Sequence, residues 1–240
     1  MTSVKRFRDW TILSKILSIS FSSLILMFLA LILYVLPVVG DKVVEMKKEG
    51  LENVVETALH LVASYDARAK AGEFSLGEAQ KRAVESVKNM AYGTSGYVWI
   101  NDMQPKMIMH PTQPQLNGTD LTDYKDPNGK RLFVEFVKIC GEKGGGTVDY
   151  MWPKPGATKP VPKSSYVKAY EPWGWVIGTG AYLDQIAAEV SSVKRKVMAI
   201  FCLVGFFVVA LTVWVARRIT KPLWRTKTAE WGRSATLWPS

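Results

Sequence analysis

The sequence is poor in residues that carry metal or nucleophilic chemistry. Its 240 residues include two histidines, His60 and His110, and two cysteines, Cys140 and Cys202. No Cys/His group has metal-ligand spacing, and no nucleophile elbow or phosphate-binding Gly-Lys-Ser/Thr loop is present. Cys140 lies in the middle of the chain and Cys202 in an apolar run, so a disulfide framework is excluded. We therefore expect no enzyme activity, no metal and no cofactor.

Acidic residues are also outnumbered, with 21 Asp and Glu against 31 Lys and Arg, which gives a net charge of +10. The excess lies at the two ends. Residues 1–40 carry +3 and residues 197–240 carry +5, whereas residues 41–196 carry only +2. Because the surplus flanks two apolar runs, it indicates membrane topology and not nucleic-acid binding.

The two apolar runs, residues 16–40 and 197–216, contain no charge. Each is long enough to cross a bilayer core, which needs about 20 helical residues. A cleaved signal peptide is the alternative for the first run, and a buried core helix is the alternative for the second. The first run is too long for a signal and lacks a small-x-small cleavage site, and the second has no polar face.

Basic residues precede the first run and follow the second, which places both ends in the cytoplasm and the middle outside. We expect a bacterial inner-membrane protein. Its predicted parts are a cytoplasmic N-terminus at 1–15, transmembrane helices at 16–38 and 197–216, and a periplasmic ligand-binding domain at 39–196.

Periodicity within the middle changes at about Gly93. Before it, apolar residues recur at helical spacing, and Ser75 with Glu78 forms a capping-box pair at the start of a second helix. After it, five short runs rich in β-branched and aromatic residues predict strands at 96–102, 106–110, 147–152, 165–170 and 175–179. One helix, at about 131–142, interrupts them, and a helical pattern returns at Tyr182. The predicted class is α+β, with a long helix before and after a five-stranded antiparallel sheet.

Alternation along these strands supplies candidate binding residues. If the faces coincide, one surface of the sheet carries an aromatic wall with one cation and one imidazole: Tyr97, Trp99, His110, Tyr150, Tyr166 and Lys168. Such a surface suits a small carboxylate. An alternative remains open, in which the rings are ordinary core, Lys168 reaches water and His110 holds the turn at Pro111. His60, between two leucines on the first helix, is expected to be structural.

Several motifs follow one another in residues 41–190. They are GYVWIND (96–102), MHP (109–111), DPNG (126–129), GTVDYMWPKPG (146–156) and WGWVIGTGAY (173–182). This series resembles the single Cache domain, of the second single-Cache type, of bacterial methyl-accepting chemotaxis receptors. The resemblance implies a PAS-like sheet behind a long helix, and acetate, propionate, pyruvate or lactate as ligands. It also supports the six pocket candidates.

The sequence ARRITKPL, at 216–223, resembles the opening of a HAMP linker, but residues 224–240 show no heptad repeat. We interpret residues 217–240 as a truncated or frame-shifted linker start with an atypical cytoplasmic tail. The expected protein is a homodimeric transmembrane chemoreceptor that signals by displacement of its second span. Two alternatives remain: the sensor part of a histidine kinase or cyclase, and a membrane-anchored binding protein without output.

Overall fold

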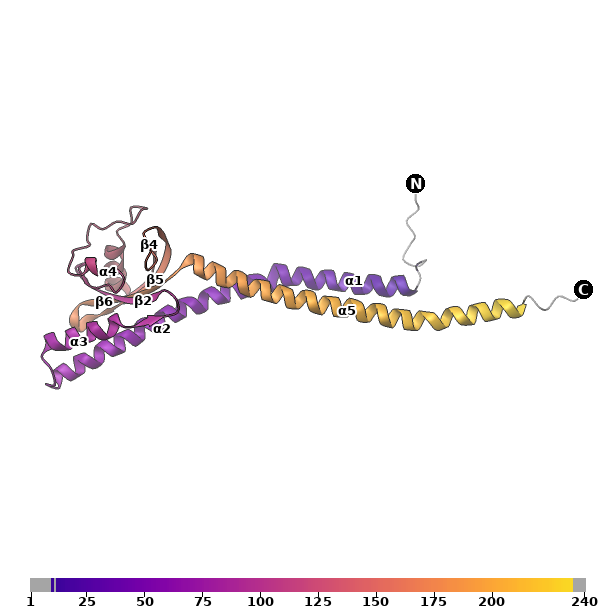
Figure 1. Ribbon diagram of the computed structural model, residues 1–240, viewed down its shortest axis with the longest axis horizontal. Helices are drawn as coiled ribbons and strands as arrows, with labels where there is room; N and C mark the ends of the chain where they lie inside the picture. Colours follow the sequence, from indigo (N-terminus) through magenta and orange to yellow (C-terminus); the bar gives the residue numbers. More distant parts are fainter. Residues whose placement is uncertain (1–9, 11, 235–240) are drawn as a thin grey trace, which may run out of the picture. The chain divides into compact units, whose positions relative to one another are not determined.

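The computed structural model describes residues 10 and 12–234, with side chains at Trp10 and at residues 14–218. Most of the expected cytoplasmic N-terminus, and the end of the atypical tail, lie outside the described residues. The chain divides into two compact units, one of residues Asp41–Ser191 and one that combines the segments before and after it. Figure 1 shows the course of the chain through both.

The unit formed by the chain's outer segments is helical. It contains α1 (Ile12–Ala30), a π-helical turn (Leu31–Val35), the beginning of α2 (Leu36–Lys70) and most of α5 (Leu183–Ser234). Two helical stretches, Ser14–Lys70 and Leu183–Arg218, are long and apolar enough to cross a membrane. Both expected spans fall within these stretches.

The unit of residues Asp41–Ser191 is built on one antiparallel sheet in the order β1-β2-β6-β5-β4, with β3 paired to β2. The strands are β1 (Ala91–Tyr92), β2 (Gly96–Asp102), β3 (Met107–Met109), β4 (Gly145–Pro153), β5 (Pro160–Tyr170) and β6 (Trp175–Tyr182). The remaining helices are α3 (Leu76–Lys88) and α4 (Leu132–Lys143).

Helices cover the two faces of this sheet separately (Figure 1). On one face, α2 and α3 pack against Val98, Ile100, Trp175 and Ile177, and we call this the helix face. On the other, α4 and the connection between β3 and α4 pack against a core that includes Tyr97, Trp99, Tyr150 and Trp152. We call this second surface the aromatic face.

The predicted α+β class, with its long N-terminal helix and antiparallel sheet, is confirmed. Ser75 is the N-cap of α3, because its Oγ accepts the backbone N–H of Glu78 at 3.2 Å. Two strands begin earlier than predicted: β4 starts at Gly145 and not at Thr147, and β5 starts at Pro160 and not at Ser165. Pro160 and Pro162 lie where β5 has only β4 as a neighbour, so their missing N–H groups break no ladder.

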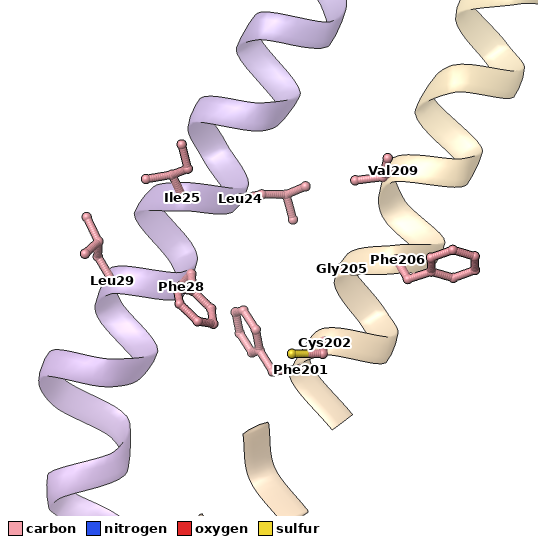
Figure 2. Close-up of a pocket in the computed structure, with 9 residues that line it drawn as sticks. All are labelled: Leu24, Ile25, Phe28, Leu29, Phe201, Cys202, Gly205, Phe206 and Val209. Carbon is pink, nitrogen blue, oxygen red and sulfur yellow. The ribbon is translucent and has the colours of Figure 1, made fainter. Parts of the chain in front are cut away.

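Within the helical unit, α1 and α5 line an apolar cavity of about 530 Å³ that is largely open along its side. Figure 2 shows Leu24 and Phe28 of α1 directed toward the space that Phe201 and Val209 of α5 also enter. The rings of Phe28 and Phe201 lie 6.2 Å apart between centroids. Nothing in this lining could fix a polar ligand, so the cavity is not a candidate for the predicted carboxylate site.

Candidate ligand-binding site

The register of the sheet assigns every strand residue to one of its two faces. Trp99 of β2 lies opposite Gly178 of β6, which lies opposite Val167 of β5. Tyr150 of β4 lies opposite Lys163 of β5. Since directly paired residues point to the same side of a sheet, the aromatic face carries these residues: Tyr97, Trp99, Tyr150, Trp152, Lys163, Ser165, Val167, Gly178, Gly180 and Tyr182.

The structure brings together four of the six predicted site residues. Tyr97, Trp99 and Tyr150 are buried on the aromatic face. His110 follows β3, and its ring centroid lies 5.0 Å from that of Tyr97 and 5.5 Å from that of Trp152. These four residues remain candidates for ligand contact.

The placement of Tyr166 and Lys168 on the same surface is wrong. Both lie on the helix face, where Tyr166 donates to Glu52 Oε1 at 3.3 Å and Lys168 forms an ion pair with Glu56. Alternation along one strand says which residues share a face, but not how one strand is aligned with the next. In β5 the residues that reach the aromatic face are Lys163, Ser165 and Val167.

Lys163 is therefore the cation of the site. It is 1% exposed, and its Nζ donates to Tyr97 Oη at 2.8 Å. The ammonium lies 4.1, 5.3 and 5.1 Å from the ring centroids of Tyr97, Trp99 and Tyr182. Among the described side chains, no Asp or Glu forms an ion pair with it. Burial lowers the pKa of Lys163 to about 7.

His110 contributes a neutral imidazole. Its Nδ1 accepts the backbone N–H of Gln113 at 3.0 Å, so the ring proton is on Nε2. The backbone N–H of His110 in turn donates to Asn117 Oδ1 at 2.8 Å. Burial, and after it the charge of Lys163, lowers the pKa of His110 to about 3. The imidazole is thus a hydrogen-bond donor at neutral pH and not a second cation. His60, by contrast, is exposed on α2.

Trp152 supplies a further donor. It is 2% exposed, and its Nε1 is the one buried side-chain nitrogen or oxygen without a hydrogen-bond partner among the residues that the structure describes. An unpaired buried N–H costs about 1–3 kcal/mol, which a ligand atom that accepts from it would offset. Trp152 lies two residues after Tyr150 in the same strand, so alternation in the sequence already predicts that the two side chains share a face.

Two glycines leave room for these side chains. A Cβ at Gly180 would lie 2.7 Å from the carbonyl oxygen of Ser164 and 2.9 Å from Lys163 Cε. A Cβ at Gly178 would meet the ring of Trp99. The Gly-Thr-Gly sequence of β6 therefore lets Lys163 and Trp99 lie flat across the sheet.

Comparisons with known proteins agree with this architecture. The family model of single Cache domain 2 matches residues 43–196, more than half of the chain, and the chain therefore belongs to this family. A solved periplasmic sensor domain of a chemotaxis protein is 51% identical, with a TM-score of 0.56 over 58% of this chain and 96% of that one. A Cache chemosensory domain, solved for the basis of its carboxylic acid recognition, is 43% identical, with a TM-score of 0.57 over 59% and 97%.

Longer relatives carry the same domain. The methyl-accepting chemotaxis protein McpP of Pseudomonas putida is 38% identical over 179 residues, which are 75% of this chain and 33% of McpP. The sensor histidine kinase MctS of Rhizobium johnstonii is 31% identical over 161 residues, 66% of this chain and 34% of MctS. The chain thus spans about a third of the length of these two relatives.

A buried lysine with no ion pair among the described side chains lowers the stability of the folded state, and a substitution can measure this effect. We predict that Lys163→Met stabilises the ligand-free protein by about 1–3 kcal/mol near pH 7, because it removes a buried amine whose one side-chain hydrogen bond, to Tyr97, does not replace a counter-ion. The pKa of the amine is 10.5 when unfolded and about 7 when folded. Between these values the unfolded state binds more protons, so the parent's stability rises with pH across this window. The stability of Lys163→Met should not increase with pH in this way.

Urea unfolding of the full chain in lipid nanodiscs, followed by tryptophan fluorescence at several pH values, measures both effects. The matched control is Lys168→Met, which breaks the ion pair with Glu56 on the helix face and should keep the rise with pH. A lower stability for Lys163→Met would show that the buried amine is compensated within the protein and would contradict this prediction.

Proposed function

We propose that this chain is the sensory part of a transmembrane chemoreceptor whose periplasmic Cache domain binds a small carboxylate, of the acetate, propionate, pyruvate and lactate class, at Lys163. The observation that carries the proposal is a fully buried lysine with no acidic partner among the described side chains. A buried cation of this kind is stabilised by an anion that enters from outside.

The neighbours of Lys163 also favour an anion. Tyr97 accepts from Lys163 and keeps its own hydroxyl proton, His110 holds a proton on Nε2, and Trp152 has a free Nε1–H. Burial raises the pKa of Tyr97, so its phenol stays protonated. Donors therefore predominate around Lys163, and a carboxylate, which has two oxygens and about four lone-pair sites, can accept from several of them.

The relatives support the same ligand class and a signalling role. The similar Cache chemosensory domain recognises carboxylic acids, and McpP is a methyl-accepting chemotaxis protein. MctS is a sensor histidine kinase, so the same input module in this chain would also serve a kinase. Because the chain spans about a third of these relatives, the output belongs to the proposal.

The signal would leave through α5. We place this receptor in the bacterial inner membrane as a homodimer, with spans at 16–38 and 197–216 and the domain at 39–196 in the periplasm. β6 ends at Tyr182 and α5 begins at the next residue, Leu183, so a shift of β6 on ligand binding would move α5 and displace the second span. Such a shift requires that ligand binds one position of β6 more tightly than the other.

Binding measurements test the proposed ligand and its site. A ligand of propionate's size gains at most about 1.5 kcal/mol per non-hydrogen atom, which gives a ceiling of about 7.5 kcal/mol and a Kd of a few micromolar. We predict that propionate binds the full chain in nanodiscs in isothermal titration calorimetry and that propionamide, which is neutral, does not. Lys163→Met should weaken binding by roughly 100-fold or more, since it removes the charge that faces the ligand.

The matched control is Lys168→Met, which should bind propionate within about threefold of the parent because its cation lies on the other face, paired with Glu56. Circular dichroism verifies that each variant is folded. Unchanged binding by Lys163→Met, or lost binding by Lys168→Met, would refute the site.

Reporter fusions test the topology. Alkaline phosphatase joined after Gly93 should be active, and green fluorescent protein joined after Leu223 should fluoresce, since the basic ends are retained in the cytoplasm. Each reporter at the opposite position is the control and should be silent. Activity of the same reporter at both positions would exclude a two-span protein.

A further inference from the structure

The charge state of Lys163 depends on what surrounds it, and the surrounding elements offer it no anion. The titratable side chains packed about it are uncharged at neutral pH, three of them phenols whose pKa burial raises and one an imidazole: Tyr97 of β2, Tyr150 of β4, Tyr182 of β6 and His110 after β3. α4 faces this core with Leu132, Phe133, Phe136 and Cys140. Burial raises the pKa of the Cys140 thiol to about 12, so it too is neutral.

Two carboxylates on the segments around this core, Asp184 and Asp126, are engaged elsewhere. Asp184, two residues after Tyr182, forms an ion pair with Lys154 at 2.5 Å. Asp126, in the connection that covers the aromatic face, accepts the backbone N–H groups of Asn128, Lys130 and Met151 at 2.9 Å each. Neither carboxylate contributes to the charge balance of Lys163, whose pKa is set by burial.

An isolated charge in such an interior is expensive, and an amine there lowers its pKa and gives up its proton. A carboxylate placed against the same amine reverses this balance, because an opposite charge within about 4–6 Å favours the ammonium. Ligand binding and protonation of Lys163 are then linked events.

We propose that the site binds a carboxylate together with a proton: the Lys163 amine is largely neutral in the empty site above neutral pH, and takes up one proton from solvent as the carboxylate enters. This inference rests on the proposed function. The balance is R–COO⁻ plus H⁺ plus the neutral amine, which gives the ammonium–carboxylate pair. No bond within the ligand changes.

His110 does not take this proton. Protonation of its Nδ1 would break the hydrogen bond from the Gln113 N–H, and the resulting imidazolium would lie beside the ammonium of Lys163. The phenols of Tyr97 and Tyr150 already hold their protons. The proton therefore goes to Lys163.

A functional consequence follows for the sensor. Above the pKa of the free amine, about 7, occupancy depends on the product of carboxylate and proton concentrations, and this product is proportional to the concentration of undissociated acid. The receptor would report weak acid in its medium and not carboxylate alone. Its affinity should fall by about tenfold for each pH unit above this pKa, as linkage requires.

Calorimetry in pairs of buffers measures the proton directly. The full chain in nanodiscs is titrated with propionate in phosphate and in Tris, whose ionisation enthalpies differ, at about pH 8.5 and again at about pH 6. We expect uptake of nearly one proton per propionate at the higher pH and almost none at the lower, with affinity at least tenfold weaker at the higher pH. Lys168→Met, on the helix face, should show the same uptake as the parent.

The possible outcomes distinguish proton uptake from carboxylate binding itself. Propionate binding at both pH values without proton uptake overturns this inference and leaves the proposed function standing. An absence of binding at both pH values overturns both. Lys163→Arg adds a second readout, because a guanidinium stays charged at either pH: where it binds propionate, it should do so without proton uptake. Uptake by Lys163→Arg equal to that of the parent would assign the proton to another group and refute the proposal.

Discussion

A buried lysine with no counter-ion among the side chains that the structure describes is the constraint on which the site depends. A charged amine loses solvation free energy when it is buried, and contacts with aromatic rings and one phenol do not restore it. Proteins retain buried charged groups of this kind where function requires them. Lys163 lies on β5, where it pairs with Tyr150 of β4 on one side and with Tyr182, at the end of β6, on the other. Gly180 on the neighbouring strand leaves the space for its side chain. The interior is thus arranged around an amine for which its own side chains supply no negative charge.

The strand that carries Lys163 also connects the two faces of the domain. Its alternate residues Tyr166 and Lys168 contact Glu52 and Glu56 of α2, while Lys163 faces the aromatic core. The proposed ligand contact on one side of β5 and the helix contact on the other therefore involve the same strand. β6 lies beside it and leads directly into α5. The helix that enters the domain, α2, therefore contacts the strand that carries Lys163, and the helix that leaves it, α5, continues from the neighbouring strand.

Much of the fold could be predicted because it is encoded locally. The start of α3 follows from one capping pair, Ser75 and Glu78, and the bounds of β2 follow from the run GYVWIND, which is rich in aromatic and β-branched residues and is closed by turns. The cation of the site could not be predicted in the same way. Pro160 and Pro162 resemble loop residues when neighbouring strands are unknown, so the sequence pattern predicts that β5 begins after Lys163. The alignment of β5 with β4 is a long-range property of the sheet. Lys168 does share a face with Tyr166, as alternation predicts, but this is the helix face.

The central claim is that Lys163, and not Lys168, holds the carboxylate of the ligand. The most direct measurement is a crystal structure of the chain, or of its Cache domain, grown with propionate. The account predicts that both carboxylate oxygens lie among the donors of the aromatic face, with at least one within hydrogen-bonding distance of Lys163 Nζ. Propionate bound on the helix face beside Lys168, or on the aromatic face with its carboxylate turned away from Lys163, would contradict it.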